Sequence, residues 1–168
     1  MAETPPKLSV PRPEESRPLD EIPMARAWLQ HLRDSAVFKL EGLNAAQLRW
    51  RPTSTANSLG MIVVHLGYAE RLWIRAIFAG ETMDMQWRSH MFELPDGWGY
   101  DEIVAFYRDE TAKVDGVLDG ATSFDLPSAG DLRPTTLRWA VLHLVEETAR
   151  HAGHMDITRE LLDGRTGR

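Results

Sequence analysis

The stretch "TLRWAVLHLVEETARHAGHMDITRELLDG", residues 136 to 164, decides the fold. At 100° per residue, six side chains of this stretch lie within about 40° of His151 around a single helix. They are Leu137, Ala140, Leu144, Met155, Thr158 and Leu162. Thr135 or Thr136 can cap the helix, and Gly164 follows its last residue, Asp163. The spacing therefore predicts one long helix with His151 at the centre of its buried face.

Three further segments have the length and periodicity of long helices, and none of the chain shows the alternation of a strand. The predicted helices cover residues 19–40, 57–80 and 101–118, and a short helix is expected in "LNAAQLRWRP", residues 43–52. In the first helix, the buried face is expected to carry Met24, Trp28, Leu32 and Ala36. Trp28, Trp73 and Trp139 are expected to pack in the core as large apolar groups. The chain is predicted to be an all-α four-helix bundle.

Composition places limits on domain number and function. With 168 residues, of which 43% are apolar, the chain suits one domain over residues 19–168, preceded by an extended proline-rich arm over residues 1–18. The net charge is −6 and the basic residues are scattered, which argues against nucleic acid as a partner. No signal peptide or membrane span is visible, so a cytoplasmic protein without a membrane partner is expected. Cysteine is absent, so any metal must be held by nitrogen and oxygen.

A second histidine is expected to point into the core. In "SLGMIVVHLGYAERLW", residues 58–73, His65 is surrounded on its helix face by Met61, Ile62, Ala69 and Leu72. If this helix runs antiparallel to the last one, His65 and His151 lie at the same depth in the bundle. That arrangement predicts an up-down-down-up order, in which the connection of about twenty residues after Gly80 carries the chain back along the bundle.

These histidines have a carboxylate within reach. Glu147 lies one turn before His151 and His154 one turn after it, so the side chain of either can approach the His151 ring. Two histidines and a glutamate in an apolar bundle satisfy one another best through a divalent cation. Three such ligands with an open fourth position are typical of catalytic zinc, although nickel, iron(II) or manganese also suits them. Such an ion acidifies a bound water or binds an incoming thiolate.

A simpler interpretation remains open, in which Glu147 and His151 form a buried hydrogen-bonded pair with His65 nearby. His143 lies about 12 Å from His151 along the helix and cannot share its metal. His143 and His31 are expected to be hydrogen-bonded or exposed. In the long connection, Trp87, His90 and Trp98 either line a pocket or belong to a loop that covers the bundle.

The segments "NSLGMIVVHLGYAERLWI", "GLNAAQLRWRP" and the last helix resemble the DinB-like superfamily, especially its actinobacterial mini-circle branch. The resemblance covers residues 19–164. It implies a four-helix bundle, often dimeric, with a metal held by one histidine of the second helix and two residues one turn apart on the last. By this resemblance the ligands are His65, Glu147 and His151. Many members carry a histidine at the position of Glu147, and this departure is similar to the mycothiol-dependent isomerase branch.

The resemblance leaves three roles for His154: it replaces Glu147, joins as a fourth ligand, or acts as a base on bound substrate. The function that the resemblance implies is a metal-dependent transferase or isomerase. Its partners would be a low-molecular-weight thiol such as mycothiol and an electrophile, and the protein would be a homodimer. The alternative is a non-catalytic, stress-associated bundle that binds a metal or a small ligand.

Overall fold

The computed structural model describes residues 12–14 and 19–166. Its main helices are α1 (Glu21–Phe38), α3 (Leu59–Glu70), α4 (Tyr100–Asp119) and α5 (Leu137–Asp163). α3 continues without a break as the π-helix η1 (Arg71–Phe78), and the short α2 (Ala45–Arg49) and η2 (Gln86–His90) lie in the connections. The described part of the chain contains no strand, only an isolated bridge between Pro127 and Thr136. The predicted all-α class is confirmed. Most of the predicted arm over residues 1–18 falls outside the described residues.

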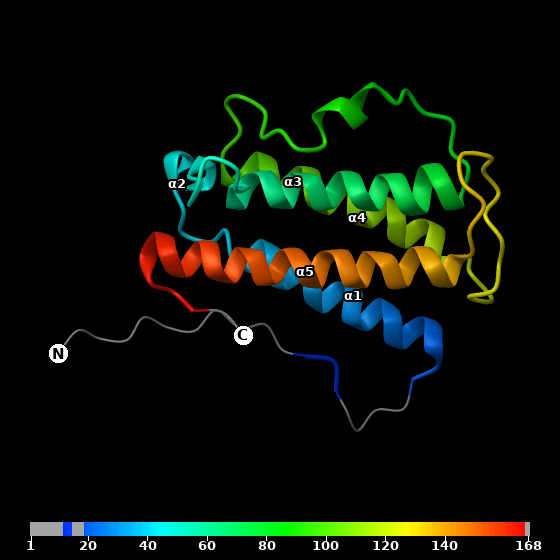
Figure 1. Cartoon of the computed structure of the whole chain (residues 1–168). Helices are drawn as coiled ribbons and strands as arrows, with labels where there is room; N and C mark the ends of the chain where they lie inside the picture. The colour runs from blue at the N-terminus through cyan, green and yellow to red at the C-terminus, as the bar shows by residue number, and fades with distance from the viewer. Residues whose placement is uncertain (1–11, 15–18, 167–168) are drawn as a thin grey trace.

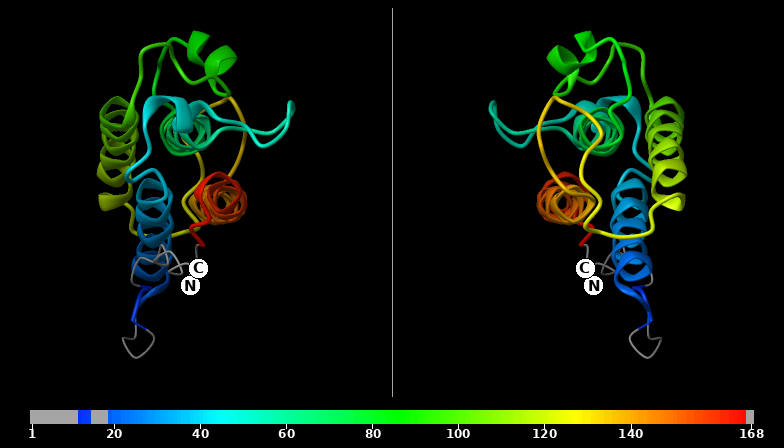
Figure 2. Two further views of the ribbon diagram at one scale, coloured as in Figure 1. Left: turned by 90° about the vertical axis from the view of Figure 1, so that its left-hand side faces the viewer. Right: turned by 90° about the vertical axis from the view of Figure 1, so that its right-hand side faces the viewer.

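Chain direction follows the predicted order. In Figure 1, α3 and α4 run one way along the bundle, and α1 and α5 run the other way, which is the up-down-down-up arrangement. The end-on views of Figure 2 show the four helices at the corners of a bundle, with α3 next to α5. The long connection between η1 and α4 returns the chain over the outside of α3. The order therefore makes α3 and α5 antiparallel neighbours, as the site requires.

Local sequence explains where the site helices begin and end. The hydroxyl of Ser58 accepts a hydrogen bond from the Met61 N–H at 3.3 Å, and that of Thr136 accepts one from the Trp139 N–H at 3.4 Å. Gly80 and Gly164 follow the helix ends with φ of +69° and +77°, a conformation that glycine adopts at low cost. The π-helix over Arg71–Phe78 was not predicted, because apolar spacing does not distinguish it from α-helix.

The tryptophan prediction was wrong for two of the three residues. Trp28 and Trp139 are 38% and 44% exposed, and Trp73 is half-buried. The buried face of α1 carries Leu29 and Arg33 instead of Trp28. A pattern of apolar residues cannot select Arg33, which is buried because it pairs with acidic side chains of other helices. Within the described residues, no helix combines the length and apolar composition needed to cross a bilayer.

Candidate metal centre

His65 lies in the middle of the seam between α3 and α5. It is 4% exposed, and its neighbours Met61, Ile62 and Ala69 are buried with it. An imidazole loses its contact with water in such a place, so its nitrogens need partners from the protein or from a ligand.

Glu147 and His151, one turn apart on α5, meet His65 at this point. The Nε2 atom of His65 lies 3.1 Å from Oε1 of Glu147, and the Nε2 atom of His151 lies 3.3 Å from the same oxygen. The two imidazole rings are 5.0 Å apart between centroids. One ligand atom from each of the three residues lies within 4.8 Å of the other two. The predicted meeting of these side chains at one depth is therefore present.

Hydrogen bonding within the group is incomplete. Both histidines use a single carboxylate oxygen, and the Nδ1 atom of each ring is buried without a hydrogen-bond partner in the described structure. The second oxygen, Oε2, lies 3.8 Å from Nη1 of Arg150. A group held together by these hydrogen bonds alone leaves the two buried Nδ1 atoms unsatisfied, which costs free energy.

The protonation states suit metal binding. Burial opposes ionisation of Glu147, but the hydrogen bond from His65 and the nearby histidines hold the pKa of this carboxyl below its usual value. Burial, together with the nearby His65, lowers the pKa of His151, although Glu147 opposes that shift. A carboxylate and a neutral imidazole are the forms that a divalent cation binds.

The spacing of the donor atoms also fits a small cation. Zinc bonds to nitrogen and oxygen are about 2.0–2.2 Å long, so two ligand atoms at a tetrahedral angle are about 3.4 Å apart. The 3.1 and 3.3 Å separations at Glu147 are close to that value. Two of the three separations therefore suit a divalent ion, and the two imidazole nitrogens lie within 4.8 Å of each other.

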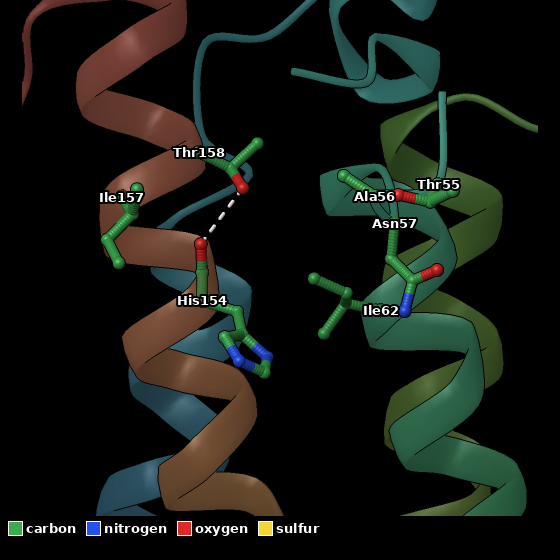
Figure 3. A pocket seen from close by; sticks show the side chains of 7 residues that line it. All are labelled: Thr55, Ala56, Asn57, Ile62, His154, Ile157 and Thr158. Carbon is green, nitrogen blue, oxygen red and sulfur yellow. Dashed lines mark hydrogen bonds between the residues drawn. The ribbon is translucent and has the colours of Figure 1, made fainter. Parts of the chain in front are cut away.

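His154, the fourth predicted site residue, lies outside this group. Its ring is 5.6 Å from that of His151, edge to face, and it is exposed. It is not among the residues whose ligand atoms converge within 4.8 Å. Figure 3 shows the ring pointing into the space between α5 and α3, opposite Asn57 and Ile62. His154 therefore lines a pocket beside the candidate metal centre.

One site residue, Phe92, was missed by the sequence analysis. Its ring stacks on His65 with centroids 4.4 Å apart and 20° between planes, although the residue is 58% exposed. It comes from the long connection, whose path cannot be read from periodicity. Nothing in the sequence distinguishes Phe92 from its neighbours.

The rest of the connection covers the bundle. Trp87 stacks on Tyr68 at 5.4 Å, and Trp98 packs against Phe106 at the same distance. His90 is exposed and pairs with Glu93 at 2.7 Å. The sequence left two interpretations of these three residues, a pocket lining or a loop that covers the bundle, and the structure favours the covering loop.

The remaining histidines lie away from the centre. His143 packs between Trp73 and Trp139, at 4.5 and 4.9 Å between ring centroids. His31 is in edge-to-face contact with Trp28. Neither belongs to the converging group, in agreement with the sequence analysis.

Together, the fold and the site define a class of protein: an up-down-down-up helical bundle with a candidate His-Glu-His metal centre between two antiparallel helices. A family profile described as mycothiol S-transferase matches residues 24–164. The chain belongs to this family, which confirms the resemblance to DinB-like proteins.

Comparison of structures supports the fold. A conserved protein from Enterococcus faecalis, known from its crystal structure, superposes with a TM-score of 0.66 at 17% sequence identity. The match covers 88% of this chain and 100% of the other, and at this identity it speaks for the fold alone. Among curated proteins, no sequence matches this chain.

Proposed function

We propose that this protein is a metal-dependent S-transferase that joins a low-molecular-weight thiol, such as mycothiol, to an electrophile. His65, Glu147 and His151 would hold the divalent ion, with zinc as the first choice and nickel, iron or manganese as alternatives. The observation that carries the proposal is the convergence of three ligand atoms from two helices within 4.8 Å, with hydrogen bonding left incomplete. Membership of the mycothiol S-transferase family supports the choice of thiol.

A bound divalent ion would lower the pKa of the thiol and favour its nucleophilic thiolate form. Side chains of the protein surround the position of the ion. Glu147 contributes a negative charge, and the buried position of His65 excludes water from one side of the site. Phe92 covers one face of the His65 ring. The chain has no cysteine, so the reacting sulfur must come from the co-substrate.

The test combines metal analysis with a conjugation assay. The purified protein is analysed for bound metal and then assayed with mycothiol and monobromobimane, alongside glutathione as a second thiol. We expect about one ion per chain and faster conjugation with mycothiol. His65→Ala should lose both metal and conjugation, because it removes the only ligand contributed by α3. Retention of full conjugation by His65→Ala would refute the proposal.

His90→Ala is the matched control. It also removes a histidine, but His90 is exposed, lies in the connection and is bonded to Glu93. Metal content and conjugation should both stay at the wild-type level. Tightly held metal without turnover of several thiols and electrophiles would favour the alternative, a non-catalytic binding protein. The homodimer expected from the resemblance stays a prediction, which analytical ultracentrifugation can check.

A further inference from the structure

A cavity of about 270 Å³ lies beside the candidate metal centre, between the start of α3 and the end of α5. Its walls come from the loop residues 55–57, from Ile62 on α3, and from His154, Ile157 and Thr158 on α5. Figure 3 shows Asn57 and Ile62 on one side of the space and the His154 ring on the other. His154 and Ile157 are exposed, so a small molecule can enter from solvent.

The antiparallel helices fix the position of this cavity relative to the site. Ile62 comes three residues before His65 on α3, and His154 comes three residues after His151 on α5. Because the two helices run in opposite directions, both displacements point the same way, by about 4.5 Å along the bundle. The cavity therefore lies about one helical turn along the bundle from the two histidines.

The lining is uncharged apart from the titratable ring of His154. It contains no aspartate, glutamate, lysine or arginine, and Ala56, Ile62 and Ile157 make it largely apolar. Thr158 already donates its hydroxyl hydrogen to the backbone carbonyl of His154 at 2.9 Å. The side chains of Asn57 and His154 make no hydrogen bond within the described residues, so both can bond to a ligand.

From these observations we infer that the cavity binds the electrophilic substrate, and that this substrate is compact and uncharged, with an apolar body and an oxygen that accepts a hydrogen bond from Asn57 or His154. The inference rests on the proposed function. Its volume of about 270 Å³ is close to the lower end of the range for small-molecule pockets, about 300–1,000 Å³. Mycothiol carries many hydroxyl groups, for which the largely apolar lining offers few partners.

A neutral epoxide meets this description. The thiolate sulfur attacks one epoxide carbon, so that a C–S bond forms while the C–O bond breaks. The oxygen leaves the carbon as an alkoxide and takes a proton from water. The two reacting atoms need to approach within about 3–3.5 Å.

The first test fills the cavity. Ala56→Phe adds a ring to a half-buried loop residue of the lining, whereas the control Ala46→Phe adds the same ring to an exposed position on α2. With styrene oxide and mycothiol as substrates, Ala56→Phe should raise the KM for styrene oxide about tenfold or more. The KM for mycothiol and the metal content should not change. Ala46→Phe should match the wild type in all three.

The second test needs no turnover. The unreactive alcohol 1-phenylethanol is titrated into the ¹⁵N-labelled wild-type protein, and the amide resonances of Ala56, Asn57 and Thr158 should shift with saturation. Saturable shifts in a protein that conjugates no thiol would refute the proposed function and support the cavity as a binding site. Conjugation with an unchanged styrene oxide KM in Ala56→Phe, without shifts at these residues, would overturn the inference and leave the proposed function intact.

Discussion

Buried ionisable groups occur on two sides of α3 and its extension η1, and the two sides differ in how fully these groups are paired. Toward α1 and α4, Arg33 is 3% exposed, and its guanidinium bonds both oxygens of Glu70, at 2.8 and 2.5 Å. Its remaining nitrogen, Nη1, reaches Asp115 at 2.9 Å. Glu110, fully buried, accepts hydrogen bonds from Arg71 and Arg75. On this side every buried charge has a partner of opposite sign.

Toward α5, the buried polar groups do not satisfy all of one another's hydrogen-bonding atoms. His65 and His151 share one oxygen of Glu147, and each keeps a buried nitrogen without a partner in the described structure. The difference separates two uses of buried polarity. A network in which every charge is paired positions helices, whereas a group of converging ligand atoms is suited to a metal ion.

The largest expected effect is a loss of stability in the network of Arg33 and Glu70. Glu70→Ala leaves the Arg33 guanidinium buried without its bidentate partner, so the free energy of unfolding should fall by about 3–5 kcal/mol. Urea denaturation measures this change. The double variant Arg33→Met, Glu70→Leu removes both charges and should recover most of the loss. A single variant as stable as the wild type would show that this network does not stabilise the bundle.

The next largest effect is a loss of zinc affinity at the candidate centre, where α5 contributes Glu147. Glu147→Gln keeps the shape of the side chain but removes its charge. Loss of an outer partner of a metal ligand costs about 10–100-fold in affinity, so loss of a ligand's charge should cost at least about 100-fold in zinc affinity. Competition with a chromogenic chelator measures it. In the metal-free protein the free energy of unfolding should change by less than about 1 kcal/mol, because the hydrogen bonding is already incomplete.

The neighbouring Glu146 provides the control for this variant. Glu146→Gln changes the same residue type on the same helix, but Glu146 is exposed and pairs with Arg150. Its zinc affinity should equal that of the wild type. Equal affinities for all three proteins would mean that the three converging side chains do not bind zinc.

The sequence was sufficient for the features that depend on periodicity. Apolar spacing and the caps at Ser58 and Thr136 located the helices to within a few residues. The same spacing brought His65 and His151 to one depth, since rise per residue is constant along a helix. These features are local or follow from the direction of two helices.

Features that depend on partners far apart in the chain could not be predicted. Arg71 and Arg75, one turn apart on η1, both pair with Glu110 of α4, and no apolar pattern indicates this pairing. Phe92 reaches His65 through an irregular connection, so its position depends on the packing of the whole bundle. Charge pairs and loop contacts of this kind have no periodic signal.

A smaller effect should appear in the dependence of stability on pH. Burial opposes ionisation of Glu110, but Arg71, Arg75 and Lys113 hold its pKa below the ordinary value of 4.5. The unfolded chain therefore binds this proton at a higher pH than the folded one, and the stabilisation is lost as pH falls below about 4.5. Urea denaturation gives the free energy of unfolding at each pH between about 3 and 6. This free energy should change less steeply with pH in Glu110→Gln than in the wild type. Glu160 is exposed, so Glu160→Gln should show the same dependence of unfolding free energy on pH as the wild type. The same dependence in all three proteins would contradict the prediction.

The smallest effect tests the contact that links the long connection to the site. Phe92 is more than half exposed, so Phe92→Ala should lower the free energy of unfolding by no more than about 1 kcal/mol. The His65 ring then loses its stacked neighbour and the cover over one face, so zinc affinity should fall a few-fold, about 0.5–1 kcal/mol. Phe92→Tyr keeps the ring and should bind zinc as the wild type does. If Phe92→Ala and Phe92→Tyr bind zinc equally well, the connection does not contribute to the site, and only α3 and α5 determine its affinity.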